Sequence, residues 1–194
     1  NRDLVEQQLR IAAGEPLDWA QDDIWIHGHA MEARVYAEDA FGGFLPQAGT
    51  ATLVRWPDDI TRVDHALESG QVVGTSYDPM LGKIIVHGRD REDARQKLIA
   101  ALDATTILGL TTNVGFLRAL AASDEFADAR VETAWLDHAE LQPPSVDTAC
   151  AIAAWAEVRS EVDNYAGPWR ADGWRLSGPS APARVMLDPL VPVD

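Results

Sequence analysis

One group of residues that could do chemistry is a run of polar side chains spaced two apart: Glu32, Arg34 and Tyr36. In an extended strand, residues at this spacing lie on one face of the sheet. The guanidinium of Arg34 would then stand beside a carboxylate and offer planar, permanently charged donors to an oxyanion. A solvated, salt-bridged sheet face explains the same spacing. Both interpretations stay open on these residues alone.

Other reactive side chains are more weakly patterned. Asp78, between Tyr77 and Pro79, is most simply a turn residue. The five histidines form no metal-binding pattern, because His27 and His29 alternate along one segment and the other three are isolated. No Gly-rich phosphate loop, nucleophile turn or paired carboxylates in an evident cleft can be identified. We therefore expect no metal site, and these residues name no reaction.

Composition excludes several classes of protein. The chain has 194 residues, 46% of them hydrophobic and 24% charged, which is typical of a soluble globular protein. Its net charge of -15 would repel a phosphate backbone, so nucleic acid is not an expected partner. The single cysteine, Cys150, fits a reducing, cytoplasmic setting. No apolar run approaches the ~20 residues needed to cross a bilayer, so no membrane association is expected.

The elements that must position these side chains follow from periodicity. A helix is predicted over residues 3–13, with Gly14 as its C-terminal cap. Residues 26–38 alternate as a strand that has Ala33 and Val35 on its apolar face and Arg34 on its polar face.

Further strands and helices are expected downstream. Three β-rich runs, at residues 50–56, 60–67 and 71–75, are interpreted as an antiparallel meander, and a further strand covers residues 83–87. The predicted helices are one capped by Asp90 whose apolar stripe reaches Leu108 and ends at Gly109, one from Asn113 through Ala122, and a short segment over 134–138. Strands first and helices later predict an α+β fold, with helices packed on one side of an antiparallel sheet.

A linker is expected over residues 142–145, because its consecutive prolines, Pro143 and Pro144, stop a helix and stiffen the chain. This divides the sequence into a domain over residues 1–141 and a region over 142–194. The second region has a predicted helix over 147–159, with Ile152, Trp155 and Ala156 on one side, and a strand over 183–187. Because the chain opens without Met and runs straight into a helix pattern, we expect it to be a piece of a longer protein.

Four ordered motifs closely resemble those of the biotin carboxylase C-terminal domain. They are residues 28–39 (GHAMEARVYAED), 44–49 (FLPQAG), 77–83 (YDPMLGK) and 112–114 (TNV). The resemblance covers about residues 3–141 and implies the fold of that domain, followed by a short helical and β tail.

The resemblance implies part of an ATP-dependent ligase that carboxylates biotin. In this family ATP and bicarbonate form carboxyphosphate, which supplies carbon dioxide, and negative charge develops on the ureido oxygen of biotin. An arginine aimed at that oxygen acts as an oxyanion-hole donor does. By match to the motifs, Arg34 is this arginine and contacts biotin, and Asp78 is the aspartate that fixes its direction.

The resemblance gives weaker roles to other residues. Glu32 would orient Arg34, although a structural salt bridge explains it equally, and Lys83 lies within the third motif but is also explained as a solvated lysine. Arg62 and Asp64 fall where bacterial homologues form subunit contacts, although cross-strand pairing explains them as well. By alignment Thr133 lies near the adenine pocket of the bound nucleotide. A backbone role is expected for three glycines: Gly28, Gly49 and Gly82.

Cofactors and partners follow from the same resemblance. ATP and Mg²⁺ would be bound by an upstream ATP-grasp domain, and biotin would be carried on a separate carrier domain, so we expect the fragment alone to be inactive. Residues 167–169 (GPW) and 172–176 (DGWRL) resemble a connector in the α subunits of methylcrotonyl- and propionyl-CoA carboxylases. This implies an acyl-CoA carboxylase, a carboxyltransferase β subunit as partner and a possible oligomer. The alternative is a non-catalytic module that closes the ATP-grasp domain and contacts the β subunit.

Overall fold

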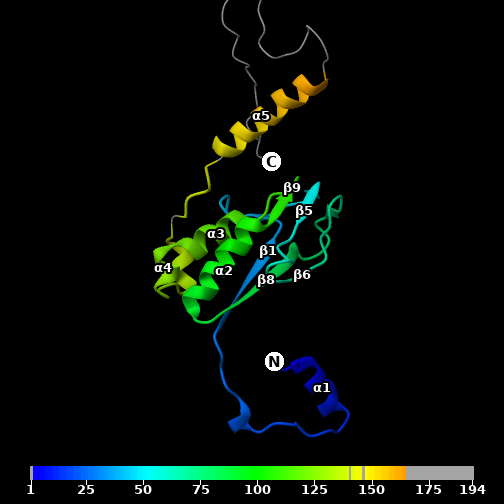
Figure 1. Ribbon diagram of the computed structural model, residues 1–194, viewed down its shortest axis with the longest axis vertical. Helices are drawn as coiled ribbons and strands as arrows, with labels where there is room; N and C mark the ends of the chain where they lie inside the picture. Colours follow the sequence, from blue (N-terminus) through cyan, green and yellow to red (C-terminus); the bar gives the residue numbers. More distant parts are fainter. Residues whose placement is uncertain (1, 140, 146, 165–194) are drawn as a thin grey trace, which may run out of the picture. The chain divides into compact units, whose positions relative to one another are not determined.

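The computed structural model describes residues 2–139, 141–145 and 147–164 (Figure 1). Contacts within the chain divide it into two units, Asn1–Gln142 and Pro143–Asp194. The strand expected over 183–187 and the two tail motifs lie outside the described residues. Within the described part, no helix combines the length and apolar character needed to span a membrane.

The first unit is an α+β domain with antiparallel strands, as predicted. Its helices are α1 (Leu4–Ala12), α2 (Arg91–Ala104), α3 (Val114–Ala122) and α4 (Asp124–Ala127), with 3₁₀ turns at Gln21–Asp23 and Thr133–Asp137. Its strands are β1 (His29–Tyr36), β2 (Glu38–Asp39), β3 (Leu45–Pro46), β4 (Gly49–Thr50), β5 (Leu53–Arg55), β6 (Arg62–His65), β7 (Val72–Val73), β8 (Met80–Gly88) and β9 (Thr106–Leu108).

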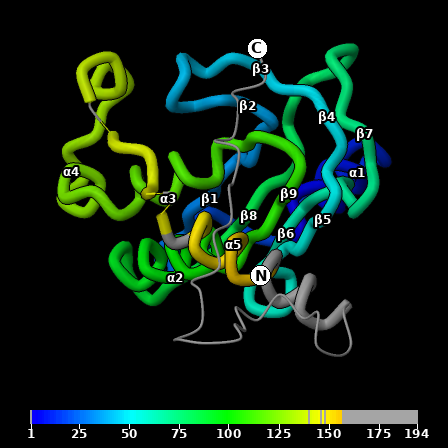
Figure 2. Tube along the Cα trace, turned by 90° about the horizontal axis from the view of Figure 1, so that it is seen from above, coloured from blue at the N-terminus to red at the C-terminus, as the bar shows by residue number. Residues whose placement is uncertain are grey.

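The main sheet has the order β1-β8-β6, with both pairs antiparallel (Figure 2). Its alternation agrees with the prediction for β1: Ala33 and Val35 are buried, and Ile84 and Val86 of β8 lie beside them in the core. Helix α2 packs on this face, where its residues Ala94, Leu98, Ala101 and Leu102 are buried (Figure 1). The opposite face of the sheet carries the charged side chains of β1, β8 and β6.

The predicted start of α2 is confirmed, and its predicted end is wrong. Asp90 caps the helix, since its side chain accepts a hydrogen bond from Asp93 N at 2.8 Å. The helix ends at Ala104, however, and Leu108 belongs to strand β9. The β-branched run that follows Ala104 has low helix propensity and suits a strand. The apolar residues beyond Ala104 therefore pair with β5 and do not extend the helical stripe.

The predicted meander is also wrong. Of the three β-rich runs, β4 pairs with β7, but β5 pairs with β9 and β6 pairs with β8 (Figure 2). Each run does contain strand, and the error concerns the partners. Between β5 and β6 the indole of Trp56 donates from Nε1 to Leu67 O at 3.1 Å and is buried. This side-chain bond is a contact between the first two runs, but their strands pair elsewhere, β5 with β9 and β6 with β8.

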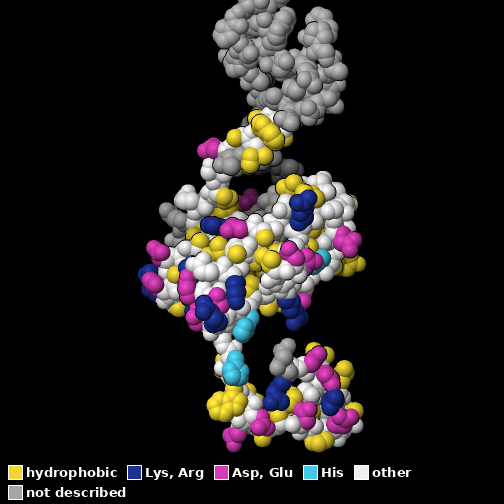
Figure 3. Space-filling model, in the orientation of Figure 1, with side chains coloured by type: hydrophobic (Ala, Val, Ile, Leu, Met, Phe, Trp, Pro, Cys, Tyr) yellow, Lys and Arg dark blue, Asp and Glu magenta, His cyan; other side chains and the backbone are white. Residues whose placement is uncertain are grey.

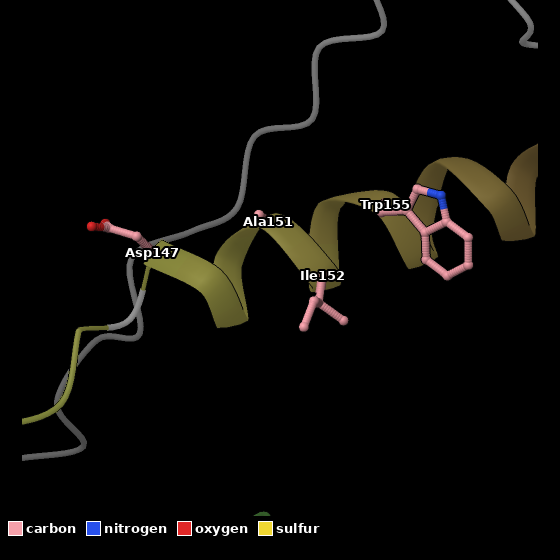
Figure 4. A pocket seen from close by; sticks show the side chains of 4 residues that line it. All are labelled: Asp147, Ala151, Ile152 and Trp155. Carbon is pink, nitrogen blue, oxygen red and sulfur yellow. The ribbon is translucent and has the colours of Figure 1, made fainter.

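The described part of the second unit includes α5 (Asp147–Asn164), which extends beyond the predicted end at residue 159. Ile152 and Trp155 are exposed and project from α5, where they line a shallow hollow with Asp147 and Ala151 (Figure 4).

Charges are mixed over the surface. On the face seen in Figure 3, acidic and basic side chains are interspersed. Short-range ion pairs on α2 also bring opposite charges together, such as Arg95 with Glu92 at 2.7 Å and Lys97 with Asp93 at 3.1 Å. On that face the net charge of -15 is therefore not gathered into a single acidic patch.

Candidate functional site

Arg34 lies on the polar face of β1, and its side chain is 61% exposed. Its Nε donates a hydrogen bond to Glu32 Oε1 at 2.9 Å, so the two residues share a face as their spacing predicted. This bond, and after it an interaction with Tyr36, raises the pKa of Arg34. A guanidinium has five N–H donors. Because Nε uses only one of them, donors remain for a ligand.

A row of charged side chains crosses the same face. Arg34 is the register partner of Lys83 on β8, and Lys83 is the partner of Asp64 on β6. Asp64 accepts two hydrogen bonds from Arg62, at 2.9 and 3.0 Å, whereas Lys83 Nζ is 3.6 Å from it. The bonds from Arg62 are the main cause of the lowered pKa of Asp64. With Glu32, this face carries three cations and two carboxylates, a local positive excess in an acidic chain.

No hydrogen bond or ion pair joins Asp78 to Arg34 among the described residues. Its Oδ1 accepts a hydrogen bond from Met80 N at 2.8 Å, and its side chain is exposed in the turn that leads into β8. Within the described residues, the ion pair of Arg34 is with Glu32. The structure therefore shows Asp78 as a turn residue, and the role that the resemblance gave it stays a prediction.

Asn113 is the residue that the sequence reasoning missed. It is only 5% exposed, and it was expected to cap α3, yet its side chain makes no capping bond. Its Oδ1 accepts from Tyr36 N at 2.9 Å, and its Nδ2 donates to Arg34 O and Glu38 Oε1, both at 3.2 Å. Glu38 is half-buried, and burial raises its pKa. The available signal was the position of Asn113 within the fourth motif.

A pocket of about 300 Å³ lies along β1 beside these residues. Its polar lining includes Glu32, Arg34, Tyr36, Glu38 and Asn113, and its apolar lining includes Leu98, Leu117, Leu120, Ala121 and Phe126. Pockets with an apolar lining and a few convergent polar groups are typical of small-molecule sites. This one can hold a ligand with an apolar body and a polar head that accepts hydrogen bonds from Arg34.

The remaining predicted residues are distributed over the first unit. Thr133 is exposed at the start of a 3₁₀ turn and does not line the pocket. Gly28 has φ +69°, which confirms its backbone role. Gly82 instead leaves room for packing, since a Cβ there would lie 2.9 Å from His65 Cβ and 3.0 Å from Trp56 Cη2. Gly49 shows neither a positive φ nor a severe close approach.

Among the residues that the structure describes, no three His, Cys, Asp or Glu side chains gather as a metal-binding group would. The carboxylates beside Arg34 instead have organic partners: Glu32 is bound by the guanidinium and Glu38 by the Asn113 amide. What this part of the domain offers a ligand is therefore the remaining guanidinium donors of Arg34.

The sequence profile of the biotin carboxylase C-terminal domain matches residues 32–138. The chain belongs to this family, and the resemblance carried by the four motifs is confirmed. The matched region includes Arg34, Lys83 and Asn113, so the pocket lies within the family domain.

Similar individual proteins include urea amidolyases and methylcrotonoyl-CoA carboxylase α subunits. The chain is 37% identical over 177 residues to the urea amidolyase of Saccharomyces cerevisiae, covering 91% of this chain and 9% of the relative. It is 36% identical over 190 residues to the mitochondrial methylcrotonoyl-CoA carboxylase subunit alpha of Dictyostelium discoideum, covering 91% of this chain and 27% of the relative. The chain thus spans only about a tenth to a quarter of the length of these proteins.

Solved structures agree with the fold. The Kluyveromyces lactis urea carboxylase is 43% identical and aligns with a TM-score of 0.67 over 73% of this chain and 12% of its own. The biotin carboxylase domain dimer of Hydrogenobacter thermophilus 2-oxoglutarate carboxylase, in complex with MgADP and bicarbonate, is 34% identical and aligns with a TM-score of 0.67 over 70% of this chain and 30% of its own. These matches confirm the α+β fold class.

Proposed function

We propose that the full-length protein carboxylates biotin with ATP and bicarbonate, and that this domain presents Arg34 to the ureido oxygen of biotin. The observation that carries the proposal is the placement of Arg34: an exposed guanidinium, held at Nε by Glu32, on the rim of a partly apolar pocket within a biotin carboxylase domain.

The residues present suit biotin, whose apolar ring system carries a ureido oxygen. Leu117, Leu120 and Phe126 offer an apolar surface, while Arg34 offers charged donors. Bound biotin supplies a ureido nitrogen that accepts the carboxyl group. ATP and Mg²⁺ we assign to an upstream ATP-grasp domain, and biotin to a separate carrier domain, as the family resemblance implies.

Within this domain, the proposed work is electrostatic. Donors that are already aimed at the place where negative charge develops stabilise the transition state without reorganising. Glu32 holds the Nε edge of Arg34, which limits rotation of the guanidinium. Lys83, on the neighbouring strand, adds positive charge to the same face. In this proposal Arg34 contacts the ligand, Glu32 orients the guanidinium, and Lys83 adds to the positive potential around it.

The test is Arg34→Ala in the full-length protein. We expect biotin carboxylation to fall on the order of 10²-fold or more, as when an oxyanion-hole donor is removed. Nucleotide affinity should stay close to that of the wild type, because no residue of the ATP site is changed. Carboxylation at the wild-type rate would remove Arg34 from the reaction. The 194-residue fragment should show no bicarbonate-dependent ATP hydrolysis, and robust turnover would contradict its dependence on an upstream domain.

We further propose that the full-length protein passes the carboxyl group to an acyl-CoA on a carboxyltransferase β subunit. The methylcrotonoyl-CoA carboxylase relatives support this proposal. The urea amidolyases compete with them, because the alignments to the yeast urea amidolyase and to the Dictyostelium carboxylase subunit each cover 91% of this chain and so include part of its tail. Urea is therefore the competing acceptor. Carboxylation assays with 3-methylcrotonoyl-, propionyl- and acetyl-CoA and with urea separate the two. Turnover with urea alone would exclude the acyl-CoA assignment.

A cytoplasmic location is also part of the proposal, and cell fractionation tests it.

A further inference from the structure

We propose that Asn113 is a positioning residue for Arg34, and that its side-chain amide holds the outer edge of β1 at the place where the guanidinium is attached. The inference rests on the proposed function, because positioning matters only if Arg34 acts on biotin. It assigns Asn113 a task in the reaction, although Asn113 itself need not touch the ligand.

The amide of Asn113 replaces a neighbouring strand. Strand β1 lies at one side of the β1-β8-β6 sheet, and within the described residues no strand pairs with its outer edge. Asn113 Oδ1 accepts from Tyr36 N at 2.9 Å, Asn113 Nδ2 donates to Arg34 O at 3.2 Å, and Asn113 N donates to Tyr36 O at 3.2 Å. Three backbone groups of β1 are thus satisfied by one residue, and one of them belongs to Arg34.

From its position in the chain, the side chain of Asn113 could instead have capped helix α3. It occupies the N-cap of α3, where an asparagine normally accepts a hydrogen bond from the first turn. Here the side chain makes no such bond and turns to β1 instead. A buried amide keeps a single orientation when its partners are satisfied, because leaving them unpaired is costly. The edge of β1 is thus tied to Asn113 by specific, directional bonds.

The chain brings Asn113 to this edge through non-local pairing. Strand β9 pairs with β5, and Thr52 N donates to Leu108 O at 2.8 Å. Gly109 follows with φ +84°, a conformation that a side chain would strain, and a Cβ there would collide with Thr50 O. The turn at Gly109 then leads through residues 110–112 to Asn113, so the β5–β9 pair sets where the amide meets β1.

Arg34 is consequently held on three sides. Its neighbours Ala33 and Val35 are buried in the core, its Nε is bound by Glu32, and its carbonyl is bound by Asn113. Loss of the Asn113 bond would free the outer edge of β1 while the inner face stays packed. A shift of about 1 Å in a positioned group can cost about 10²-fold in rate.

The first experiment compares Asn113→Ala and Asn113→Asp in the full-length protein, using ¹⁴C-bicarbonate fixation onto biotin. We expect Asn113→Ala to lower kcat about 10- to 100-fold and to leave the KM for ATP within about twofold of the wild type. Asn113→Asp keeps the side-chain size and the acceptor for Tyr36 N, but it loses both donors and places a second carboxylate beside Glu38, so its kcat should fall at least as far as that of Asn113→Ala. Asn113→Ala adds no charge and is the variant expected to fold, which far-UV circular dichroism checks. Wild-type kcat in either folded variant overturns the proposal.

The second experiment repeats these substitutions in an Arg34→Ala background. A residue that acts through Arg34 should cause no further loss there, whereas a merely structural residue should lower the remaining activity by the same factor as in the wild type. Thr61→Val is the matched control. It removes the bond from Thr61 Oγ1 to Ile85 O, at 2.6 Å, on the other side of β8, and any loss it causes should be equal in both backgrounds.

The outcomes are distinguishable. If Arg34→Ala lowers carboxylation and the Asn113 substitutions lower it by the same factor in both backgrounds, the positioning role is wrong and the proposed function stands. If Arg34→Ala leaves carboxylation unchanged, Arg34 has no role in the reaction, and the role of Asn113 falls with it.

Discussion

The two isoleucines of β8 provide a test of the face assignment on which the site depends. Ile84 and Ile85 are adjacent, so they point to opposite faces of the sheet. Ile84 is 0% exposed and packs in the core, while Ile85 is half-buried on the charged face beside Glu32 and Arg62, its register partners. Replacing each by alanine removes the same atoms from the two faces.

The expected difference can be worked from burial. Three carbons removed at about 0.8 kcal/mol per buried methylene give about 2.4 kcal/mol at Ile84. A residual cavity raises this to about 3–4 kcal/mol, within the range for buried large-to-alanine substitutions. At Ile85, which is partly in water before the change, we expect about 1 kcal/mol or less. For a chain of this size, about 3–4 kcal/mol corresponds to a fall in Tm of roughly 6–16 °C.

The assay is thermal and urea denaturation of both variants, followed by far-UV circular dichroism. An Ile84→Ala midpoint well below that of Ile85→Ala supports the assigned faces. Equal losses, or a larger loss for Ile85→Ala, would show that β8 presents its other face to α2. In that case Lys83, which shares a face with Ile85, could not stand beside an exposed Arg34.

Two further predictions concern stability. Hydrogen bonds from Arg95, then Gln96, lower the pKa of Glu92 from 4.5 to about 2. The ionised Glu92 therefore stabilises the fold above about pH 4.5, and this stabilisation is lost as the pH falls toward about 2. Glu92→Gln should flatten the fall of the urea midpoint across that pH range. Gly82→Ala should lower stability by about 1–3 kcal/mol in urea denaturation, because its Cβ would press on Trp56. Gly74→Ala, where nothing lies within 4 Å, is the control and should be near neutral; equal effects would contradict the packing role.

Local patterns were sufficient for helix starts and for strand faces. Asp90 caps α2 as its sequence position predicted, because a capping side chain reaches only two or three residues along the chain. The helix predicted from residue 3 likewise begins there, with Asp3 as its N-cap. The alternation of β1 likewise predicted that Arg34 would lie outside the core, since only one register buries Ala33 and Val35 together.

Strand partners could not be predicted in the same way. The runs that form β5 and β6 have no local signal that directs them to β9 and β8, because pairing depends on packing between residues far apart in sequence. The helix stripe was extended to Leu108 for a related reason: apolar residues at helical intervals also fit a short strand when a partner is available. Both errors arose where tertiary contacts decide.

In the candidate site, too, the local contact could be predicted from the sequence and the non-local contact could not. The Glu32–Arg34 contact is local, and their two-residue spacing predicted it. Asn113 meets Arg34 across 79 residues of sequence, and its type and position fit a helix cap as well as a strand edge. Sequence alone favoured the cap because it is the commoner use of asparagine in that position.

The register of β1 links the stability of the domain to its proposed chemistry. A slip of one residue would exchange the two faces of β1, which would bury Arg34 and expose Val35. Burying an unpaired guanidinium is far more costly than burying valine, so the core that forms around Val35 and Ile84 also keeps Arg34 outside. The core sets which face Arg34 lies on, but not how far the outer edge of β1 can move. That freedom is what Asn113 removes, which is why we expect its loss to affect carboxylation beyond any loss of stability.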